Sequence, residues 1–369
     1  MVLFLRHYRK PVTGAHYRYD RVVRFAAKSD NLILLSPYVE PEIENKISCY
    51  WFELPFLNSV TVKTFLAALL NFFKLLKYRN KVKVIIVFGE TTAPAALLVS
   101  LILSAPISAG LRSNVRKRHE ISLAVDGSKN IYLKRMKFRT FDIFLSFFYK
   151  FSNQIIVQTE LAKEVFIDQY RIEPAKVRVV NNDMPIEFKK QFYESPFSCE
   201  RAKKILFIGN STRIKGFDIY IEALKNIPAD TFNKLTFVGV STNDIAPLLS
   251  LGFEAVSIEQ SGDIANLMLE HDALVVPSRE DQFPNVVLEA LAIGLPVVGS
   301  NVDGIKYMIN DDKFLFESGD VDSLTILLNL ITDSGFYDSC HKNILKQRSR
   351  FDFCWEQDYL NNVMSVFND

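Results

Sequence analysis

A carboxylate lies within an apolar helical stretch in the second half of the chain. Residues 273–300 read ALVVPSREDQFPNVVLEALAIGLPVVGS, a pattern typical of strand, loop, helix and strand. Pro284 suits the first helical turn, and Gly294 suits the position just past the helix end. The helix between them is apolar except at Asn285 and Glu289, which are four residues apart and share a face. We therefore expect Glu289 to be buried and its charge to need hydrogen-bond donors.

Two kinds of donor could satisfy such a carboxylate: a pair of sugar hydroxyls, or an internal Arg or Lys. The preceding loop adds Asp281 beside a helix N-terminus, where free N–H groups favour an anion. Residues 203–227, KKILFIGNSTRIKGFDIYIEALKNI, form a second strand-loop-helix pattern with Arg213 and Lys215 just after the strand. An Arg fork and a Lys point charge together can hold a diphosphate, although loop cations taken alone are typical of any surface.

Short apolar runs alternate with helical stretches along the whole chain. Runs of this kind are typical of strands buried on both faces of a parallel sheet, so each half is predicted to be an α/β repeat unit. The polar segment 181–204, which contains two prolines, is predicted to be an irregular linker between the halves. The expected strands are 31–35, 83–88, 107–111, 154–157 and 177–180, then 204–209, 235–240, 254–258, 273–277 and 296–299.

The net charge of +2 conceals an uneven distribution of charge. Residues 1–190 contain 30 Lys and Arg against 16 Asp and Glu, whereas the rest of the chain contains 14 and 26. The basic half predicts an anionic partner, and residues 61–81 and 132–150 mix cations with Phe and Leu as helices on a bilayer surface do. No nucleic-acid-binding motif accompanies the charge, so a nucleic acid is not expected.

The second of these stretches carries many large apolar side chains. They cover too broad an arc for one contact stripe, so part of the helix must pack on the protein. We expect core packing for most of them, which are Met136, Phe138, Phe141, Phe144, Phe147, Phe148 and Phe151.

Residues 91–111 are uncharged over 21 positions, nominally enough to cross a bilayer. Pro106 would break such a helix, so a buried helix at 95–103 and a strand at 107–111 are expected instead. The N-terminal residues MVLFLRHYRK begin with five of strand-like apolar character, followed by cations, and contain no apolar stretch long enough for a signal peptide. Four widely spaced cysteines predict neither a disulfide framework nor a structural metal. These features favour a cytoplasmic protein.

The combination of ILFIGNSTRIKGFDIYIEAL, a strand ending in PS, and EDQFPNVVLEALAIGLPVVGSNVDGI resembles the retaining nucleotide-sugar glycosyltransferases of the GT-B fold, in particular the glycosyltransferase group 1 (GT4) family. The resemblance is clearest over residues 204–310. It implies an α/β fold of two Rossmann-like domains whose parallel sheets face each other across a cleft. Residues 1–190 would bind the acceptor, residues 191–350 would bind the nucleotide sugar, and a helix in 351–369 would pack back on the first domain.

The resemblance also implies roles for individual residues. Arg213 and Lys215 resemble the pair that grips the donor diphosphate, and Glu289 resembles the carboxylate that accepts hydrogen bonds from the ribose. Asp281 stands where the family usually has Glu, which holds the transferred sugar, and Glu280 is a competing candidate. The loop whose backbone N–H groups touch sugar and phosphate resembles Gln282, Phe283, Pro284 and Asn285.

Two departures from the family pattern lie in the first half. Gly14 stands alone where the family usually has Gly-Gly, in a loop expected to close on the diphosphate. ISAGLRSNV places Arg112 where many members have a histidine. These departures and Asp281 keep open a nucleotide-sugar-binding subunit that has lost catalysis. A nonhydrolysing sugar-nucleotide epimerase would share the architecture, but the chain lacks its histidine-rich cleft.

The resemblance implies an enzyme that moves a sugar, with retention, from a nucleotide-diphosphate sugar to a lipid-linked, O-antigen, lipopolysaccharide or capsule glycan. Fixed cations and a helix N-terminus would stabilise the leaving diphosphate, so neither a metal nor a cofactor is expected. The acceptor hydroxyl would attack on the leaving-group face, and a phosphate oxygen would take its proton. With the basic first half, we expect the protein to work at the inner face of the cytoplasmic membrane on an anionic glycolipid or glycan.

Overall fold

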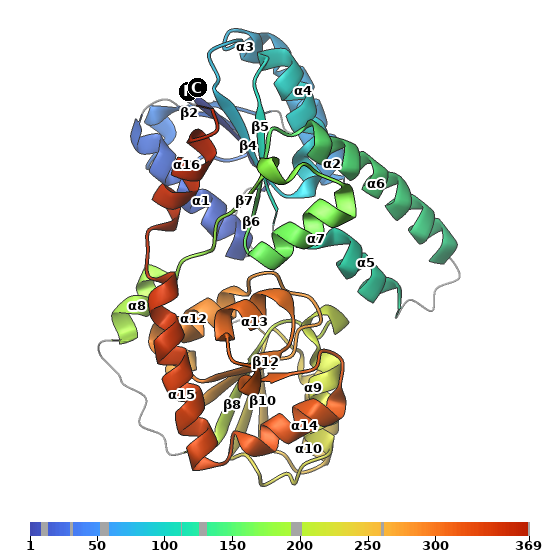
Figure 1. Ribbon diagram of the computed structural model, residues 1–369, viewed down its shortest axis with the longest axis vertical. Helices are drawn as coiled ribbons and strands as arrows, with labels where there is room; N and C mark the ends of the chain where they lie inside the picture. The colour runs from blue at the N-terminus through green and yellow to red at the C-terminus, as the bar shows by residue number, and fades with distance from the viewer. Residues whose placement is uncertain are drawn as a thin grey trace. The chain divides into compact units, whose positions relative to one another are not determined.

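The computed structural model describes residues 1–8, 14–29, 32–51, 59–111, 113–124, 131–192, 201–259 and 262–367. The chain forms two compact units (Figure 1). Unit 1 consists of Met1–Arg112, Tyr132–Asn181 and Cys354–Asp369, and unit 2 of Ser113–Ile131 and Asn182–Phe353. Each unit has its own parallel sheet with helices on it, so the predicted α/β fold class is confirmed.

Unit 1 is built on a seven-stranded parallel sheet of order β3-β2-β1-β4-β5-β6-β7. The inner strand β1 pairs Val2 with Leu32 of β2 on one side and with Val84 of β4 on the other. The strands are β1 (Val2–Leu5), β2 (Leu32–Leu35), β3 (Ile47–Tyr50), β4 (Val84–Phe88), β5 (Ile107–Gly110), β6 (Gln154–Val157) and β7 (Val177–Val179). The strand β3, at the edge of the sheet, is the one that the sequence analysis missed.

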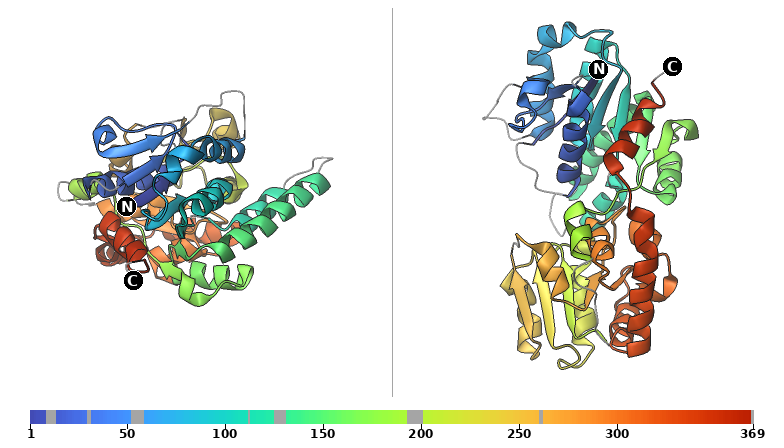
Figure 2. Two further views of the ribbon diagram at one scale, coloured as in Figure 1. Left: turned by 90° about the horizontal axis from the view of Figure 1, so that it is seen from above. Right: turned by 90° about the vertical axis from the view of Figure 1, so that its left-hand side faces the viewer.

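Helices cover both faces of this sheet, as Figure 2 shows from two further directions. The uncharged stretch forms a helix and a strand, α4 and β5, as expected. No described helix is both long and apolar enough to cross a membrane. The helices of unit 1 are α1 (Gly14–Ala26), α2 (Val60–Leu70), α3 (Phe72–Leu76), α4 (Ala93–Leu103), α6 (Ile131–Phe151), α7 (Glu160–Tyr170) and α16 (Trp355–Met364), with short 3-10 turns at Ala27–Ser29, Glu44–Lys46, Glu90–Thr92 and Pro174–Lys176.

The C-terminal helix α16 belongs to unit 1 and packs against α1. Glu356 accepts a hydrogen bond from Arg21 Nε at 2.7 Å. The ring of Tyr359 meets Phe88 edge-on, with centroids 5.2 Å apart. The chain therefore returns to its first unit after completing the second.

The helix α6 is much more exposed than its sequence predicts. Figures 1 and 2 show it extending away from the sheet of unit 1. Of the seven large apolar side chains expected in the core, Phe148 is buried, Phe138, Phe141 and Phe144 are half-buried, and Met136, Phe147 and Phe151 are exposed. The expectation of core packing was wrong for most of them, because the buried residues of α6 are confined to one short stretch near its C-terminal end, at Leu145, Phe148 and Tyr149.

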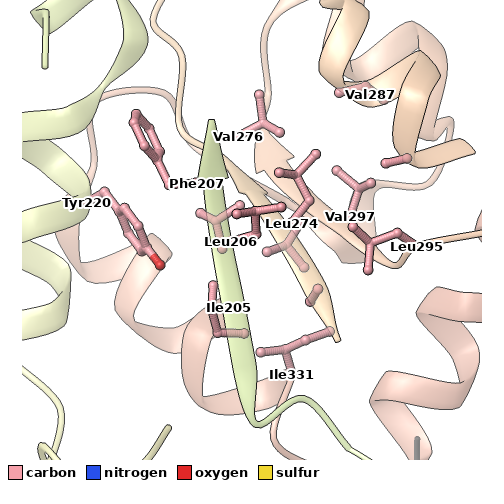
Figure 3. Packing of buried hydrophobic residues seen from close by; sticks show 14 of the residues in the cluster. Ile205, Leu206, Phe207, Tyr220, Leu274, Val276, Val287, Leu295, Val297 and Ile331 are labelled. Atoms are coloured by element: carbon pink, nitrogen blue, oxygen red, sulfur yellow. The ribbon is translucent and has the colours of Figure 1, made fainter. Parts of the chain in front are cut away.

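Unit 2 contains a six-stranded parallel sheet of order β10-β9-β8-β11-β12-β13. Figure 3 shows its centre, where Leu206, Leu274 and Val297 from three neighbouring strands pack together. The strands are β8 (Lys204–Ile208), β9 (Lys234–Val238), β10 (Ala255–Ile258), β11 (Ala273–Val276), β12 (Val297–Ser300) and β13 (Leu315–Phe316). All but the two-residue β13 were expected from the sequence.

The expected linker is not irregular throughout. It contains the helix α8 (Ile186–Phe192), which belongs to unit 2 and packs against α12. Phe188 is buried there, which gives this polar segment a place in the core. The other helices of unit 2 are α5 (Val115–Leu123), α9 (Phe217–Lys225), α10 (Thr242–Ser250), α11 (Ile264–Leu269), α12 (Asn285–Ile293), α13 (Asp303–Ile309), α14 (Val321–Leu330) and α15 (Ser334–Arg348), with 3-10 turns η5 (Arg213–Lys215), η6 (Asp312–Phe314) and η7 (Ser349–Phe351).

Candidate functional site

The loops after β8 and β11 emerge side by side at the centre of the unit 2 sheet. From β8 the chain proceeds outward to β9 and β10, and from β11 it proceeds outward in the other direction to β12 and β13. The strand order thus reverses between β8 and β11. Open parallel sheets bind ligands at such a switch point, at the carboxyl ends of the strands. The sequence-predicted residues Arg213, Lys215 and Asp281 all lie in these two loops.

The backbones of the two loops are in direct contact. Gly216 has a φ of +69°, and a Cβ at this position would lie 1.7 Å from the carbonyl oxygen of Pro277. The N–H of Arg279 donates to the carbonyl of Ile214 at 2.8 Å. Only glycine combines this left-handed conformation with so close an approach. The cations of the first loop are therefore held at a fixed distance from the carboxylates of the second.

The closest side-chain contact between the loops is an ion pair. Lys215 Nζ lies 2.5 Å from Asp281 Oδ2, and the two side chains are 36% and 16% exposed. Since both are accessible to solvent, the pair itself stabilises the fold little. Its consequence is positional, because it joins the residue expected to hold a diphosphate to the residue expected to hold a sugar.

Arg279, which the sequence analysis did not single out, contacts both the backbone of Arg213 and the carboxylate beside its side chain. Its guanidinium donates to both carboxylate oxygens of Asp218, at 2.5 and 2.8 Å, and to the carbonyl of Arg213 at 2.8 Å. Arg213 Nε lies 3.7 Å from the same Asp218. A planar Arg fork of this kind fixes its partner in orientation as well as distance. The position of Arg279 two residues before Asp281, in a loop at the switch point, is the signal that could have identified it.

The helix α12 has the bounds that its sequence predicts. Pro284 occupies the N-cap, and Gly294 ends the helix with a φ of +86°. Asn285 and Glu289 share a face and are both half-buried, so the expectation of a fully buried Glu289 was wrong. That face is only partly covered, whereas Val287, Leu288 and Leu291 are buried in the core.

The loop that leads into α12 is pinned from both sides. The ring of Phe283 packs against Tyr307 and Phe351, with centroids 6.0 and 5.8 Å away. A Cβ on Gly304 would lie 2.1 Å from the carbonyl oxygen of Gln282, and the N–H of Gly304 donates to the carbonyl of Asp281 at 3.2 Å. These contacts hold the loop in place, and its last residue, Pro284, leads directly into the N-terminus of α12, the positive end of the helix dipole.

Glu280, the competing candidate, has a different role in the structure. It is 6% exposed and accepts a hydrogen bond from the N–H of Asn114, at the start of α5, at 3.0 Å. Desolvation raises the pKa of its carboxyl to about 7, and Asp281 acts in the same direction, while the Asn114 N–H, Arg118 and Lys117 oppose it. The carboxylate thus holds α5 against the site, where this basic helix contacts the turn η5.

The raised pKa of Glu280 makes a prediction about stability. In the unfolded chain this group ionises near its ordinary pKa, and in the folded protein it ionises near pH 7. Its contribution to the free energy of unfolding is therefore fully present below pH ~4.5 and is lost as the pH rises through about 7. Between pH 5 and pH 8, thermal unfolding midpoints of the wild type should fall relative to those of Glu280→Gln. Parallel midpoints for the two proteins would contradict this assignment.

Two sequence-predicted residues belong to unit 1. Arg112 lies outside the described residues. Gly14 is the first residue of α1 in unit 1, and its surroundings lie outside the described part of the chain. Their expected roles toward the acceptor and the diphosphate stay predictions.

Comparison with known proteins accounts for this arrangement of loops. Residues 202–333 match the family model described as glycosyl transferases group 1. The match covers 132 of the 369 residues, all of them in unit 2. The matched region begins just before β8 and contains both loops of the site, with Arg213, Lys215, Asp281 and Glu289. The resemblance seen in the motifs is thus confirmed for residues 202–333, where it was clearest.

Curated relatives of the group 1 region are enzymes that act on different acceptors. The chain is 26% identical over 199 residues to the UDP-Gal:alpha-D-GlcNAc-diphosphoundecaprenol alpha-1,3-galactosyltransferase of Escherichia coli. These residues make up 49% of this chain and 51% of the relative. It is 24% identical over 241 residues to a D-inositol 3-phosphate glycosyltransferase of Corynebacterium kroppenstedtii, covering 58% and 53%. The chain thus spans about half the length of the curated relatives it matches.

Solved structures match over nearly the whole chain and show its fold. Sucrose-phosphate synthase from Thermosynechococcus elongatus superposes with a TM-score of 0.73 at 15% identity, covering 99% of this chain and 97% of that one. The glycosyltransferase WaaG, involved in lipopolysaccharide biosynthesis, superposes with a TM-score of 0.72 at 16% identity, covering 98% and 99%. The HepE protein of Anabaena, in complex with UDP and glucose, gives 0.71 at 16% identity, covering 99% of both chains. The fold is the GT-B fold.

Proposed function

We propose that this protein is a retaining glycosyltransferase that moves a sugar from a nucleoside diphosphate sugar to a lipid-linked, lipopolysaccharide or capsule-type glycan. The observation that carries the proposal is the junction of the loops after β8 and β11. There Lys215 and Arg213 lie beside Asp281, at the switch point of the sheet. Relatives that act in glycan assembly, and a structural neighbour that binds UDP and glucose, support the choice of substrates.

The chemistry follows from where charge develops. The bond between the anomeric carbon and the diphosphate oxygen breaks, and a bond from the acceptor oxygen to the same face of that carbon forms. The proton of the acceptor hydroxyl moves to a phosphate oxygen of the leaving group, so no protein base is required. Lys215, Arg213 and the N-terminus of α12 stabilise the negative charge that builds on the diphosphate.

The ion pair at the site suggests how the donor is received. A diphosphate carries more charge than one carboxylate, so it competes with Asp281 for the Lys215 ammonium. When Lys215 turns to the phosphate, Asp281 is released to accept from a sugar hydroxyl. Glu289, half-exposed on α12, is the group we assign to the ribose hydroxyls.

The function is tested by donor screening followed by product detection. A nucleoside diphosphate sugar at ~100 times its dissociation constant should stabilise the full chain by about 2.7 kcal/mol, which thermal shift detects. Each donor that binds is then incubated with polyprenyl-diphosphate-linked and lipopolysaccharide-core acceptors, and mass spectrometry reports transfer. We expect the sugar to be transferred with its anomeric configuration retained, at equal rates with and without EDTA. Donor binding without transfer to any acceptor would favour the non-catalytic subunit instead.

We further propose that unit 1 contacts an anionic membrane through α6. Tyr132, Met136, Ile143 and Phe147 are exposed along one face of this helix. Four cations lie in its N-terminal half, Lys134, Arg135, Lys137 and Arg139, and Asp142 is its one acidic residue. Exposed apolar side chains flanked by cations are typical of helices lying on anionic bilayers. This surface would place the protein at the inner face of the cytoplasmic membrane, where it would meet a glycolipid acceptor.

Vesicle flotation tests the α6 surface. The wild type should bind phosphatidylcholine vesicles that contain about a third phosphatidylglycerol, and phosphatidylcholine alone much more weakly. Lys137→Glu/Arg139→Glu should weaken binding to the anionic vesicles by at least roughly 30-fold, since each of the two lost cations is worth about 1 kcal/mol near the surface. The control is the same charge change on α15, Lys342→Glu/Lys346→Glu. Equal binding to both vesicle types would refute the membrane surface.

A further inference from the structure

Gln282 has a side-chain amide that the folded protein does not satisfy. The residue is 2% exposed, and both Oε1 and Nε2 are inaccessible to water. Neither atom forms a hydrogen bond within the described part of the chain. Burying an amide without partners costs about 1–3 kcal/mol, so an unpaired carboxamide of this kind calls for an explanation.

The loop cannot relieve this cost by moving its backbone. The carbonyl of Gln282 is pressed against Gly304, and the next side chain, Phe283, is held between Tyr307 and Phe351. The amide itself stands on three rotatable bonds and can turn while the backbone stays in place. Its neighbour Asp281 is paired with Lys215, so the amide lies in the loop that we assign to the donor.

We propose that the Gln282 carboxamide recognises the transferred sugar by hydrogen bonds to its hydroxyls, an inference that rests on the proposed function. The amide offers one acceptor and two donors. An ionised phosphate accepts hydrogen bonds only, so it would leave Oε1 unpaired. Vicinal sugar hydroxyls donate and accept, so they satisfy both ends of the amide. Gln282 is therefore a specificity-determining residue whose binding partner is a hydroxylated sugar ring.

This role separates the effects of substitution on stability and on specificity. In Gln282→Met a side chain of similar length carries no unpaired polar atoms, so the donor-free variant should unfold at a temperature about 2 °C higher than the wild type. The matched control is Gln347→Met in α15, since Gln347 is also 2% exposed but its amide is bonded to Asn343 and Arg350. That variant should unfold at a lower temperature than the wild type.

Specificity is read from UDP-glucose and UDP-galactose and from analogues that lack one sugar hydroxyl at a time. For the wild type, kcat/KM should fall 10- to 100-fold for at least one deoxy analogue, because the missing hydroxyl leaves the Gln282 amide unpaired again. Gln282→Met should lose this discrimination while its dissociation constant for UDP is unchanged. Gln282→Glu, which keeps an acceptor but loses both donors, should retain part of it.

The outcomes distinguish this inference from the function on which it rests. If the wild type transfers sugar but Gln282→Met discriminates against the same deoxy analogue equally well, or unfolds at a lower temperature, the role of Gln282 is refuted and the proposed function stands. If the wild type binds none of the nucleoside diphosphate sugars, the proposed function is refuted, and the inference falls with it.

Discussion

Replacing Lys215 with alanine should lower the turnover of sugar transfer by roughly 10²- to 10³-fold, the usual effect of removing one group that stabilises charge in a transition state. The ammonium lies in the loop after β8, at a distance from the α12 loop that Gly216 fixes. No other described side chain pairs with Asp281, so the variant loses both the phosphate contact and the partner that orients this carboxylate.

The fold should tolerate this change, because the Lys215–Asp281 pair is accessible to solvent and such pairs contribute about 0–1 kcal/mol. Circular dichroism and the unfolding midpoint should therefore match those of the wild type. Lys225→Ala, which removes another cation of the same unit from an exposed pair with Glu222, is the control and should keep full activity. Near-normal turnover of Lys215→Ala would refute the assignment of the diphosphate site.

Glu289→Gln should weaken the binding of nucleoside diphosphates about 10- to 100-fold, since hydrogen bonds to a charged group are worth about 1.5–3 kcal/mol. The carboxylate lies half-buried on α12, the helix that follows the Asp281 loop, and shares a face with Asn285. An amide of the same shape keeps one acceptor oxygen but loses the charge. The loss should appear in calorimetric titrations with UDP.

The sugar of the nucleotide distinguishes a ribose contact from a general effect. The wild type should bind the nucleoside diphosphate selected in the donor screen more tightly than its 2′-deoxyribose counterpart, and Glu289→Gln should bind the two about equally. Glu222→Gln on α9 is the control for an exposed carboxylate of the same unit. If Glu289→Gln keeps the preference for ribose, the glutamate serves the structure rather than the nucleotide.

Local signals in the sequence were sufficient to place the elements of the site. Pro284 and Gly294 define the start and end of α12, because a fixed φ and a left-handed residue act on the backbone where they stand. Continuous apolar runs located the inner strands of both sheets, because these strands are buried on both faces. The edge strand β3 was missed because its residues are only partly buried, and β13 because two residues carry no periodicity.

Contacts between distant residues could not be derived in this way. Lys215 and Asp281 are 66 residues apart, and their pairing depends on β8 and β11 being neighbours in the sheet. The bond from the Asn114 N–H to Glu280 joins residues still farther apart. Glu289 was expected to be buried because α12 is apolar on nearly every side, but its polar face lies at the edge of the core. Amphipathic sequence alone does not show how much of a helix is covered.

The backbone contact between Gly216 and Pro277 limits how the two loops of the site could be re-engineered. A segment grafted from a relative in place of residues 277–284 would have to place a backbone carbonyl where that of Pro277 lies. Otherwise the turn at Gly216 would lose its packing contact with this loop. Exchanging both segments as a matched set preserves that contact. Chimeras that swap them together should express as folded proteins more often than chimeras that swap either one alone.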